Sequence, residues 1–316
     1  MGLAGKVIEG DRRSAARLIS LIENGDDGIR PELAELHRKS GRAQLVGITG
    51  SPGAGKSTLI HKLARGWRER GRTVGIIAVD PSSPFTGGAL LGDRIRMQDL
   101  STDPGVFIRS MSSRGNPGGI ARATCDATRV LDALGMDKVI VETVGAGQSE
   151  VDVMDIVHTV LVLVVPGLGD DIQAIKAGIL EIGDIFVINK ADRDGVEAAQ
   201  RELEMMLELE DEKGPWRPPI LRTVASKSEG IGPLLDKIEE HWAMIKKEGI
   251  LEETERKRCR REVLELLKHK AVLSLLAEFG PDNFDALIAS VAKKKLHPHD
   301  AVEAILGSKK SKKGRK

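Results

Sequence analysis

Aromatic side chains are scarce in this sequence: it has no tyrosine, and aromatic residues make up 3% of its 316 positions. Few aromatic side chains are therefore available to form a platform on which exposed bases stack, as they do in many single-strand nucleic-acid binders. The net charge of +1 creates no overall field that would favour nucleic acid or a membrane as partner. The composition, with 41% hydrophobic residues, is that of a globular protein with an aliphatic core.

The sequence also has few cysteines and no long apolar run. Cys125 and Cys259 lie far apart without metal-ligand or redox spacing, which favours two free thiols in a reducing compartment. The longest apolar run, "VLVLVV" at residues 160–165, is too short to span a bilayer. The first residues, "MGLAGKVIEGDRRSAARL", lack the apolar core of a signal peptide. We therefore expect a cytoplasmic protein.

Seven short, β-branched apolar runs follow one another from residue 43 onward. They are "AQLVGITG", "TVGIIAVDP", "VFIRSM", "KVIVETVG", "TVLVLVVPG", "DIFVINKAD" and "ILRTVA". Helix-patterned segments or glycine-rich loops separate most of them. Strands that are apolar on both faces and alternate with helices are typical of a largely parallel sheet with helices on both sides. The sequence therefore predicts an α/β domain over residues 42–247.

Helical segments flank this domain on both sides. Residues 1–41 are predicted to form a helical N-terminal extension, and residues 248–306 a charged helical arm that carries an apolar stripe. Such a stripe must be buried, either against the chain's own core or against another protomer, and we favour an arm that makes a homodimer. Residues 307–316 contain six basic residues and are predicted to be a disordered tail.

A phosphate-binding loop is predicted where the first strand, "LVGIT", meets the helix "STLIHKLARGWRE". The residues between them fit G-x-x-x-x-G-K-[S/T] in the strand–loop–helix context that this motif requires. Backbone N–H groups of the loop would point at the phosphates, Lys56 would bridge the β- and γ-phosphates, and Ser57 would ligate Mg²⁺. The predicted nucleotide contacts are Gly50, Ser51, Pro52, Gly53, Ala54, Gly55, Lys56, Ser57 and Thr58. The chain is predicted to be a P-loop NTPase.

Carboxylates at the ends of other strands are candidates for the magnesium site. Asp80 ends "GIIAVD", and Glu142 lies in "KVIVETVG", so both are expected at the carboxyl edge of the sheet, where α/β proteins bind ligands. Asp93, in "GGALLGDRIRM", is less secure by position alone. Gly145 follows Glu142 as in a D-x-x-G switch with Glu in place of Asp, and its N–H can contact the γ-phosphate. We predict Lys56, Asp80, Glu142 and Gly145 as the catalytic set.

A base-reading motif, N-K-x-D, follows the strand "DIFVI". The carboxylate of Asp192 can accept hydrogen bonds from the N1–H and the exocyclic amine of guanine, which adenine does not offer in that arrangement. Lys190 can lay its stem against the base, and Asn189 can tie this loop to the P-loop. In "TVASKSEG", either Ala225 or Ser226 would supply a backbone donor to guanine O6. The predicted nucleotide is GTP.

With these motifs in order, the sequence resembles the MeaB/ArgK-type GTPases, the methylmalonyl-CoA mutase-associated family that includes the human methylmalonic aciduria type A protein. The resemblance covers roughly residues 8–250. The stretches that carry it are "GDRRSAARLISLIE", "GITGSPGAGKSTLI", "VDPSSPFTGGALLGDRIRM", "MSSRGNPGGIA", "VIVETVGAGQSE" and "PGLGDDIQAIKAGILEIGDIFVINKAD".

The resemblance implies a chaperone role and further site residues. Family members are paired GTPases that associate with an adenosylcobalamin-dependent acyl-CoA mutase, gate its cofactor loading and protect it from inactivation. By this resemblance Asp80, Asp93 and Glu142 would be the magnesium carboxylates, and "ETVGAGQ" one switch. "GDDIQAIKAG" would be a further switch in which Lys176 signals to the mutase. No cobalamin is expected to bind to this chain itself.

The hydrolytic step is predicted to be slow in the isolated protein. Ala146 stands directly after Gly145, where many GTPases have a glutamine, and Gln148 two positions further on could serve, although a solvated role is equally plausible. Intrinsic hydrolysis should therefore rise when a partner orders the switches. Asp80 is our candidate for a residue near the attacking water.

Other functions stay open at this level. One is an amino-acid transport kinase of the ArgK type, although no acceptor-binding signature is visible. Another is a nickel-insertion GTPase, although Cys125 and Cys259 lack matching metal ligands. A nucleotide-gated scaffold with incidental hydrolysis is a third. The mutase itself, which could act on methylmalonyl-, isobutyryl- or ethylmalonyl-CoA, is not specified by the sequence.

Overall fold

The computed structural model describes residues 2–80, 98–112, 119–143, 154–167, 180–209 and 215–313. The chain divides into two compact units, Met1–Leu251 and Glu252–Lys316. The first unit contains the helices α1 (Leu3–Ile8), α2 (Arg12–Glu23), α3 (Arg30–His37), α4 (Lys56–Glu69), α6 (Gln98–Ser101), α7 (Gly119–Ala133), α11 (Val196–Glu208) and α12 (Ile231–Lys247), with the 3-10 helices η1 (Asp27–Ile29) and η2 (Ala225–Lys227).

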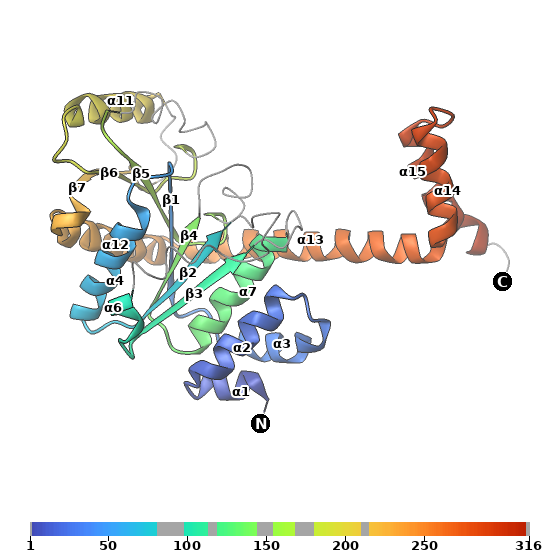
Figure 1. Cartoon of the computed structure of the whole chain (residues 1–316), viewed down its shortest axis with the longest axis horizontal. Coiled ribbons are helices and arrows are strands. Elements are labelled where there is room, and N and C mark those ends of the chain that lie inside the picture. Colours follow the sequence, from blue (N-terminus) through green and yellow to red (C-terminus); the bar gives the residue numbers. More distant parts are fainter. Residues whose placement is uncertain are drawn as a thin grey trace. The chain divides into compact units, whose positions relative to one another are not determined.

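A seven-stranded parallel sheet runs through the first unit (Figure 1). Its strands are β1 (Gln44–Gly50), β2 (Val74–Asp80), β3 (Val106–Ser112), β4 (Lys138–Thr143), β5 (Thr159–Val164), β6 (Ile185–Asn189) and β7 (Ile220–Thr223). Their order is β3-β2-β4-β1-β5-β6-β7, and every pairing is parallel. Each predicted strand is present, so the predicted α/β class is confirmed.

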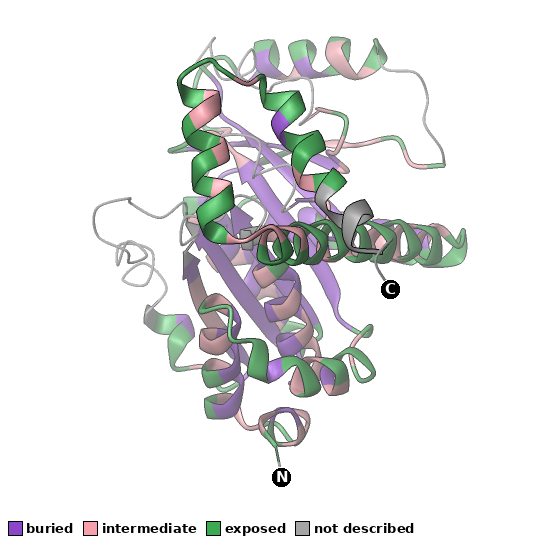
Figure 2. Cartoon of the chain, turned by 90° about the vertical axis from the view of Figure 1, so that its right-hand side faces the viewer, coloured by how far each residue is buried: buried purple, intermediate pink, exposed green. Residues whose placement is uncertain are grey.

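Helices cover both faces of the sheet and bury it, as the predominantly purple strands in Figure 2 show. On one face α4, α6 and α12 pack around Trp67, Ile140 and Leu161. On the other face α7 and α11 pack around buried apolar side chains that include Val139 and Val141. Alternate residues of a strand point to opposite faces, so a strand covered on both sides has to be apolar throughout. This is why the strands read as continuous apolar runs.

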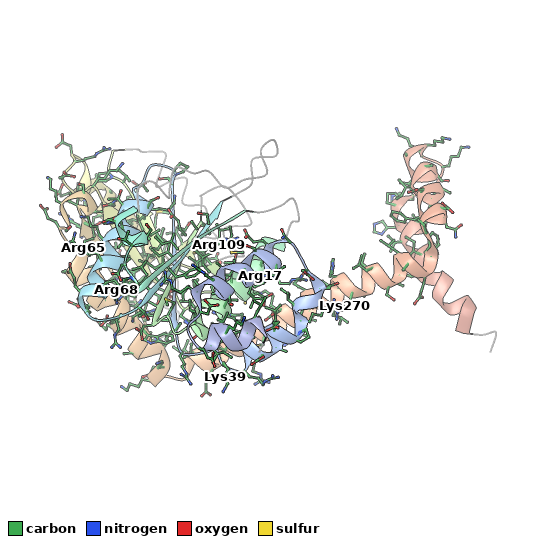
Figure 3. All side chains as sticks on the ribbon, turned by 60° about the horizontal axis from the view of Figure 1, so that its bottom comes forward. Arg17, Lys39, Arg65, Arg68, Arg109 and Lys270 are labelled. Carbon is green, nitrogen blue, oxygen red and sulfur yellow. The ribbon has the colours of Figure 1, made fainter. Side chains whose placement is uncertain are left out.

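The N-terminal helices α1–α3 form an outer layer on α7 and belong to the first unit. Asp11 caps α2, because its carboxylate accepts from the backbone N–H groups of Arg13 and Ser14. Arg109 of the edge strand β3 donates to Ser20 Oγ at 3.0 Å and forms an ion pair with Glu23, both on α2 (Figure 3). The extension predicted over residues 1–41 is therefore attached to the sheet.

The second unit is helical. It contains most of α13 (Ile250–Phe279) and all of α14 (Pro281–Ala292) and α15 (Pro298–Lys313). Helix α14 contacts α15. No residue of α13 is buried, and Val263 and Leu267, one turn apart, are 63% and 61% exposed. In the described ranges of the chain, no helix is both long and apolar enough to cross a membrane.

The structure differs from the predicted disordered tail at residues 307–313. These residues continue α15 to Lys313. Lysine has a good helix propensity, and positive charge is favourable near a helix C-terminus, so a lysine-rich segment that follows a helix can extend it.

Candidate functional site

The loop between β1 and α4 has the shape that a phosphate-binding loop needs. Gly50 has φ +143°, and a Cβ built on it would lie 2.4 Å from the carbonyl oxygen of Leu163. Gly55 has φ +91°, and its Cβ would lie 2.5 Å from Asn189 Nδ2. Both positions therefore require glycine, for the backbone conformation and for space. The second contact also shows that the loop and the base-reading motif are packed against each other.

Lys56 begins α4 and turns its side chain back over the loop. Its Nζ donates to the carbonyl oxygens of Gly50 at 2.6 Å and Ser51 at 3.1 Å. Only 8% of the residue is exposed. A buried ammonium group at the N-terminus of a helix, beside a loop of backbone N–H groups, is suited to bind a phosphate chain.

Ser57 and Glu142 meet at the carboxyl edge of the sheet. The Ser57 hydroxyl donates to Glu142 Oε1 at 3.1 Å, and Glu142 is almost completely buried in β4. Magnesium binds hard oxygen ligands, so a hydroxyl and a carboxylate at the phosphate loop fit this ion. Among the described side chains, no group of three or more His, Cys, Asp or Glu residues could hold a metal by itself. Phosphate oxygens and water would have to complete the coordination.

Only part of the predicted magnesium and switch set can be placed. Asp80 is the last residue of β2, which pairs with β4 beside Glu142, but its side chain is not described. Asp93, Gly145, Gln148 and Lys176 lie outside the described residues.

Asn189 joins three segments at the end of β6. Its Nδ2 donates to the carbonyl oxygen of Ala54 at 2.8 Å, which ties it to the P-loop. Its Oδ1 accepts from Thr223 Oγ1 at 3.1 Å and from the backbone N–H of Ala225 at 3.2 Å. Because the side chain is 98% buried, these bonds are sheltered from water. Asn189 thus connects the phosphate loop directly with the two segments predicted to hold guanine.

Lys190 and Asp192 flank the expected position of the base. Lys190 adopts a left-handed backbone conformation with φ +56°, and its Nζ donates to the carbonyl oxygen of Gly53 at 2.7 Å. The carboxylate of Asp192 forms an ion pair with Lys227 at 3.0 Å. The hydrogen bond from Lys227 holds the pKa of Asp192 below its ordinary value. Asp192 is therefore ionised at neutral pH, as a hydrogen-bond acceptor for guanine has to be.

Thr223 and Lys227 also belong to this site, although neither is part of a recognised nucleotide-binding motif. Thr223 holds the Asn189 side chain, and Lys227 holds that of Asp192. Ala225 and Ser226, the predicted donors to guanine O6, lie between them in η2. Lys227 directly follows Ser226 in the segment "TVASKSEG", so its position next to the predicted guanine donors could have been read from the sequence.

Comparisons with known proteins agree with this geometry. The model of the methylmalonyl-CoA mutase-associated GTPase MeaB family matches residues 15–278. The chain belongs to this family. A Pyrococcus abyssi protein that carries a GTPase name is 50% identical over 307 residues, which cover 96% of this chain and 95% of that protein. The fold, the family match and this relative support GTPase activity for this chain.

Two further similarities extend the comparison. The mitochondrial methylmalonic aciduria type A homolog of Caenorhabditis elegans is 35% identical over 265 residues, which cover 78% of this chain and 66% of that protein. The crystal structure of a LAO/AO transport system kinase has a TM-score of 0.74 and 26% identity, and the match covers 96% of this chain and 95% of that one. The P-loop NTPase fold of the MeaB-family chain is shared with that structure.

Proposed function

We propose that this MeaB-family GTPase hydrolyses GTP as a chaperone of an adenosylcobalamin-dependent acyl-CoA mutase, gating its cofactor loading and protecting it from inactivation. The observation that carries the GTP-dependent part is the attachment of Asn189 to both the P-loop and the 223–228 segment. The mutase as partner is supported by the family to which the chain belongs.

The residues of the site have separate tasks in this proposal. Lys56 binds the β- and γ-phosphates, and Asp192 accepts the two hydrogen bonds of guanine. Ser57 and Glu142, with Asp80 and Asp93, would hold Mg²⁺, which when bound would neutralise charge on the phosphates. Gly145, Gln148 and Lys176 would report the nucleotide state to the partner. We keep the cytoplasm as the expected compartment, since Cys125 and Cys259 are both free thiols.

The first experiment measures GTP turnover by the purified full-length chain, alone and mixed with candidate adenosylcobalamin-dependent mutases. We expect slow turnover alone and a rise of at least about tenfold with one mutase, because partner-ordered switches orient the attacking water. An acyl-CoA enzyme that uses no cobalamin is the matched control.

Three other outcomes would contradict parts of the proposal. If GTP turnover were the same with every mutase as without one, the GTPase activity would stand, but the mutase would not be the partner. If the mutase left GTP turnover unchanged and still loaded its cofactor normally, the chain would be a nucleotide-gated scaffold whose hydrolysis is incidental. Transfer of the γ-phosphoryl group to an acceptor, instead of release of phosphate, would indicate a kinase.

We further propose that α13 pairs with a second copy of the chain. The exposed Val263 and Leu267 lie on one side of the helix and would be covered in a dimer. Light scattering should give a dimer for the wild type and a monomer for Leu267→Glu, because a charge would be buried without a partner.

His269→Glu is the control for the arm. His269 lies two residues after Leu267 and therefore on the other side of the helix, so this variant should remain dimeric. A dimer that persists in Leu267→Glu and after truncation at Gly249 would show that the arm does not make the interface.

A further inference from the structure

A histidine on the P-loop helix makes a contact that the proposed GTP chemistry does not use. His61 lies on α4, one turn after Ser57, and its side chain is 16% exposed. Its Nε2 lies 2.9 Å and 2.7 Å from the two carboxylate oxygens of Asp99, which belongs to the short helix α6. The two helices are therefore joined one helical turn from Ser57, a predicted magnesium ligand.

The chemistry of the two groups decides where the proton of this contact lies. The hydrogen bond from His61 holds the pKa of Asp99 below its ordinary value, so the carboxylate is ionised at neutral pH and can only accept. The donor is therefore Nε2 of His61. A hydrogen bond to an ionised carboxylate is stronger than one between neutral groups.

A second contact holds the following residues on the same side of α4. Arg68 lies two turns after His61 and forms an ion pair with Asp103 at 2.9 Å (Figure 3). Between the two aspartates, Leu100 is 5% exposed and belongs to the apolar core that α4 also covers. The stretch from Asp99 to Asp103 is thus fixed along one side of the P-loop helix.

The position of this stretch in the chain connects it with the magnesium site. Asp80 ends β2 at the carboxyl edge of the sheet, and α6 is the next element that the structure describes. Asp93, a predicted magnesium ligand, comes between them in the sequence, six positions before Asp99 and outside the described residues. Six residues span at most about 20 Å even when fully extended. A fixed Asp99 therefore restricts the positions that Asp93 can take relative to Ser57.

We propose that His61 and Asp99 are positioning residues for the magnesium site of this GTPase. Their hydrogen bond holds the start of α6 on the P-loop helix and so limits where Asp93 can lie relative to Ser57. The inference rests on the proposed function, in which these two residues would hold Mg²⁺. Loss of the contact removes no ligand. Binding of Mg²⁺ would then have to order a connection that the folded chain otherwise fixes, which costs conformational entropy.

The test is the Mg²⁺ dependence of nucleotide binding by the full-length chain. A fluorescent, non-hydrolysable GTP analogue is titrated in rising concentrations of Mg²⁺, and its affinity is also measured in EDTA. His61→Ala should raise the Mg²⁺ concentration needed for half-maximal binding by about tenfold, as the loss of groups that support metal ligands typically does. The affinity in EDTA should match that of wild type, because the P-loop and the guanine contacts are intact.

Further variants show whether the two side chains act as a pair. Asp99→Ala should have the same effect as His61→Ala, and the double variant should bind Mg²⁺ no more weakly than either one. Because 62% of the Asp99 side chain is exposed, this variant keeps the test valid even if His61→Ala folds poorly. His61→Gln retains an N–H donor and should bind Mg²⁺ like wild type. Arg65→Ala is the matched control, since Arg65 is 63% exposed and pairs with Glu69 on the same helix.

Arg68→Ala separates positioning from stability. It removes the second contact of the stretch, two turns further from the P-loop, so it should lower the midpoint of thermal unfolding and leave the Mg²⁺ dependence unchanged. Equal changes of the Mg²⁺ dependence in Arg68→Ala and His61→Ala would show that both contacts merely stabilise the fold, and the proposal would be wrong.

Asp93→Asn separates this inference from the proposed function. If His61→Ala matches wild type while Asp93→Asn needs more Mg²⁺, the magnesium site stands and the positioning role is wrong. If neither variant changes the Mg²⁺ dependence, Asp93 is not a ligand, and the inference fails together with that part of the proposed function.

Discussion

Replacement of Lys56 by alanine should lower the rate of GTP hydrolysis by about a thousandfold. Lys56 is a buried residue, and its ammonium group donates to the carbonyl oxygens of Gly50 and Ser51 in the P-loop. Without it, the charge that develops on the β- and γ-phosphates has no buried cation beside it. Single-turnover hydrolysis at saturating GTP and Mg²⁺ measures the effect on the chemical step.

Lys62→Ala is the matched control for this prediction. Lys62 lies on the same helix, and its removal takes away the same charge without touching the P-loop, so hydrolysis should be unchanged. Thermal unfolding of Lys56→Ala is measured alongside, because the substitution also removes the donor to the carbonyl oxygens of Gly50 and Ser51 and any loss of stability has to be separated from the loss of rate. A rate within tenfold of wild type in Lys56→Ala would show that the lysine does not act on the phosphates.

Replacement of Asp192 by asparagine should change which base the protein binds. We expect the affinity for GTP to fall by about a hundredfold or more, because the amide NH₂ of asparagine meets the amino group of guanine, donor against donor. Xanthine has a carbonyl oxygen where guanine has that amino group. Xanthosine triphosphate should therefore bind to Asp192→Asn more tightly than GTP does, and competition for a fluorescent nucleotide measures both.

Asp194→Asn is the control, because it lies two residues further along and is exposed. Its preference for GTP should equal that of wild type. A variant Asp192→Asn that still prefers GTP over xanthosine triphosphate would show that the carboxylate does not read the base. The loss of its ion pair with Lys227 would then be the only consequence of the substitution.

Much of the fold followed from local patterns. Strands such as β4 and β5 are buried along their whole length. A strand that is buried on both faces requires a continuous apolar sequence, which can be recognised directly. The P-loop could be found because its chemistry is local: two glycines, Gly50 and Gly55, and the start of a helix lie within a few residues. The helical character of residues 248–306 was likewise predicted from their own apolar periodicity.

The features that could not be predicted from the sequence depend on residues that are distant along the chain. Lys227 lies 35 positions after Asp192 in the numbering, and only the pairing of β6 with β7 brings the two together. His241 and Asp184 belong to no motif in the sequence. The contacts of His241 with Trp216 and Thr159, and of Trp216 with the backbone of Asp184, join residues far apart along the chain, which no local pattern records.

The sequence by itself determined the fold class and predicted the phosphate loop and guanine as the base, since each rests on side chains or spacings within short segments. The tertiary structure decided the strand order, the attachment of Asn189 to the P-loop and the meeting of Ser57 with Glu142. These features depend on which strands and helices become neighbours. That choice is made by the summed burial of all elements, whereas the motifs are set by the backbone and side chains of a few consecutive residues.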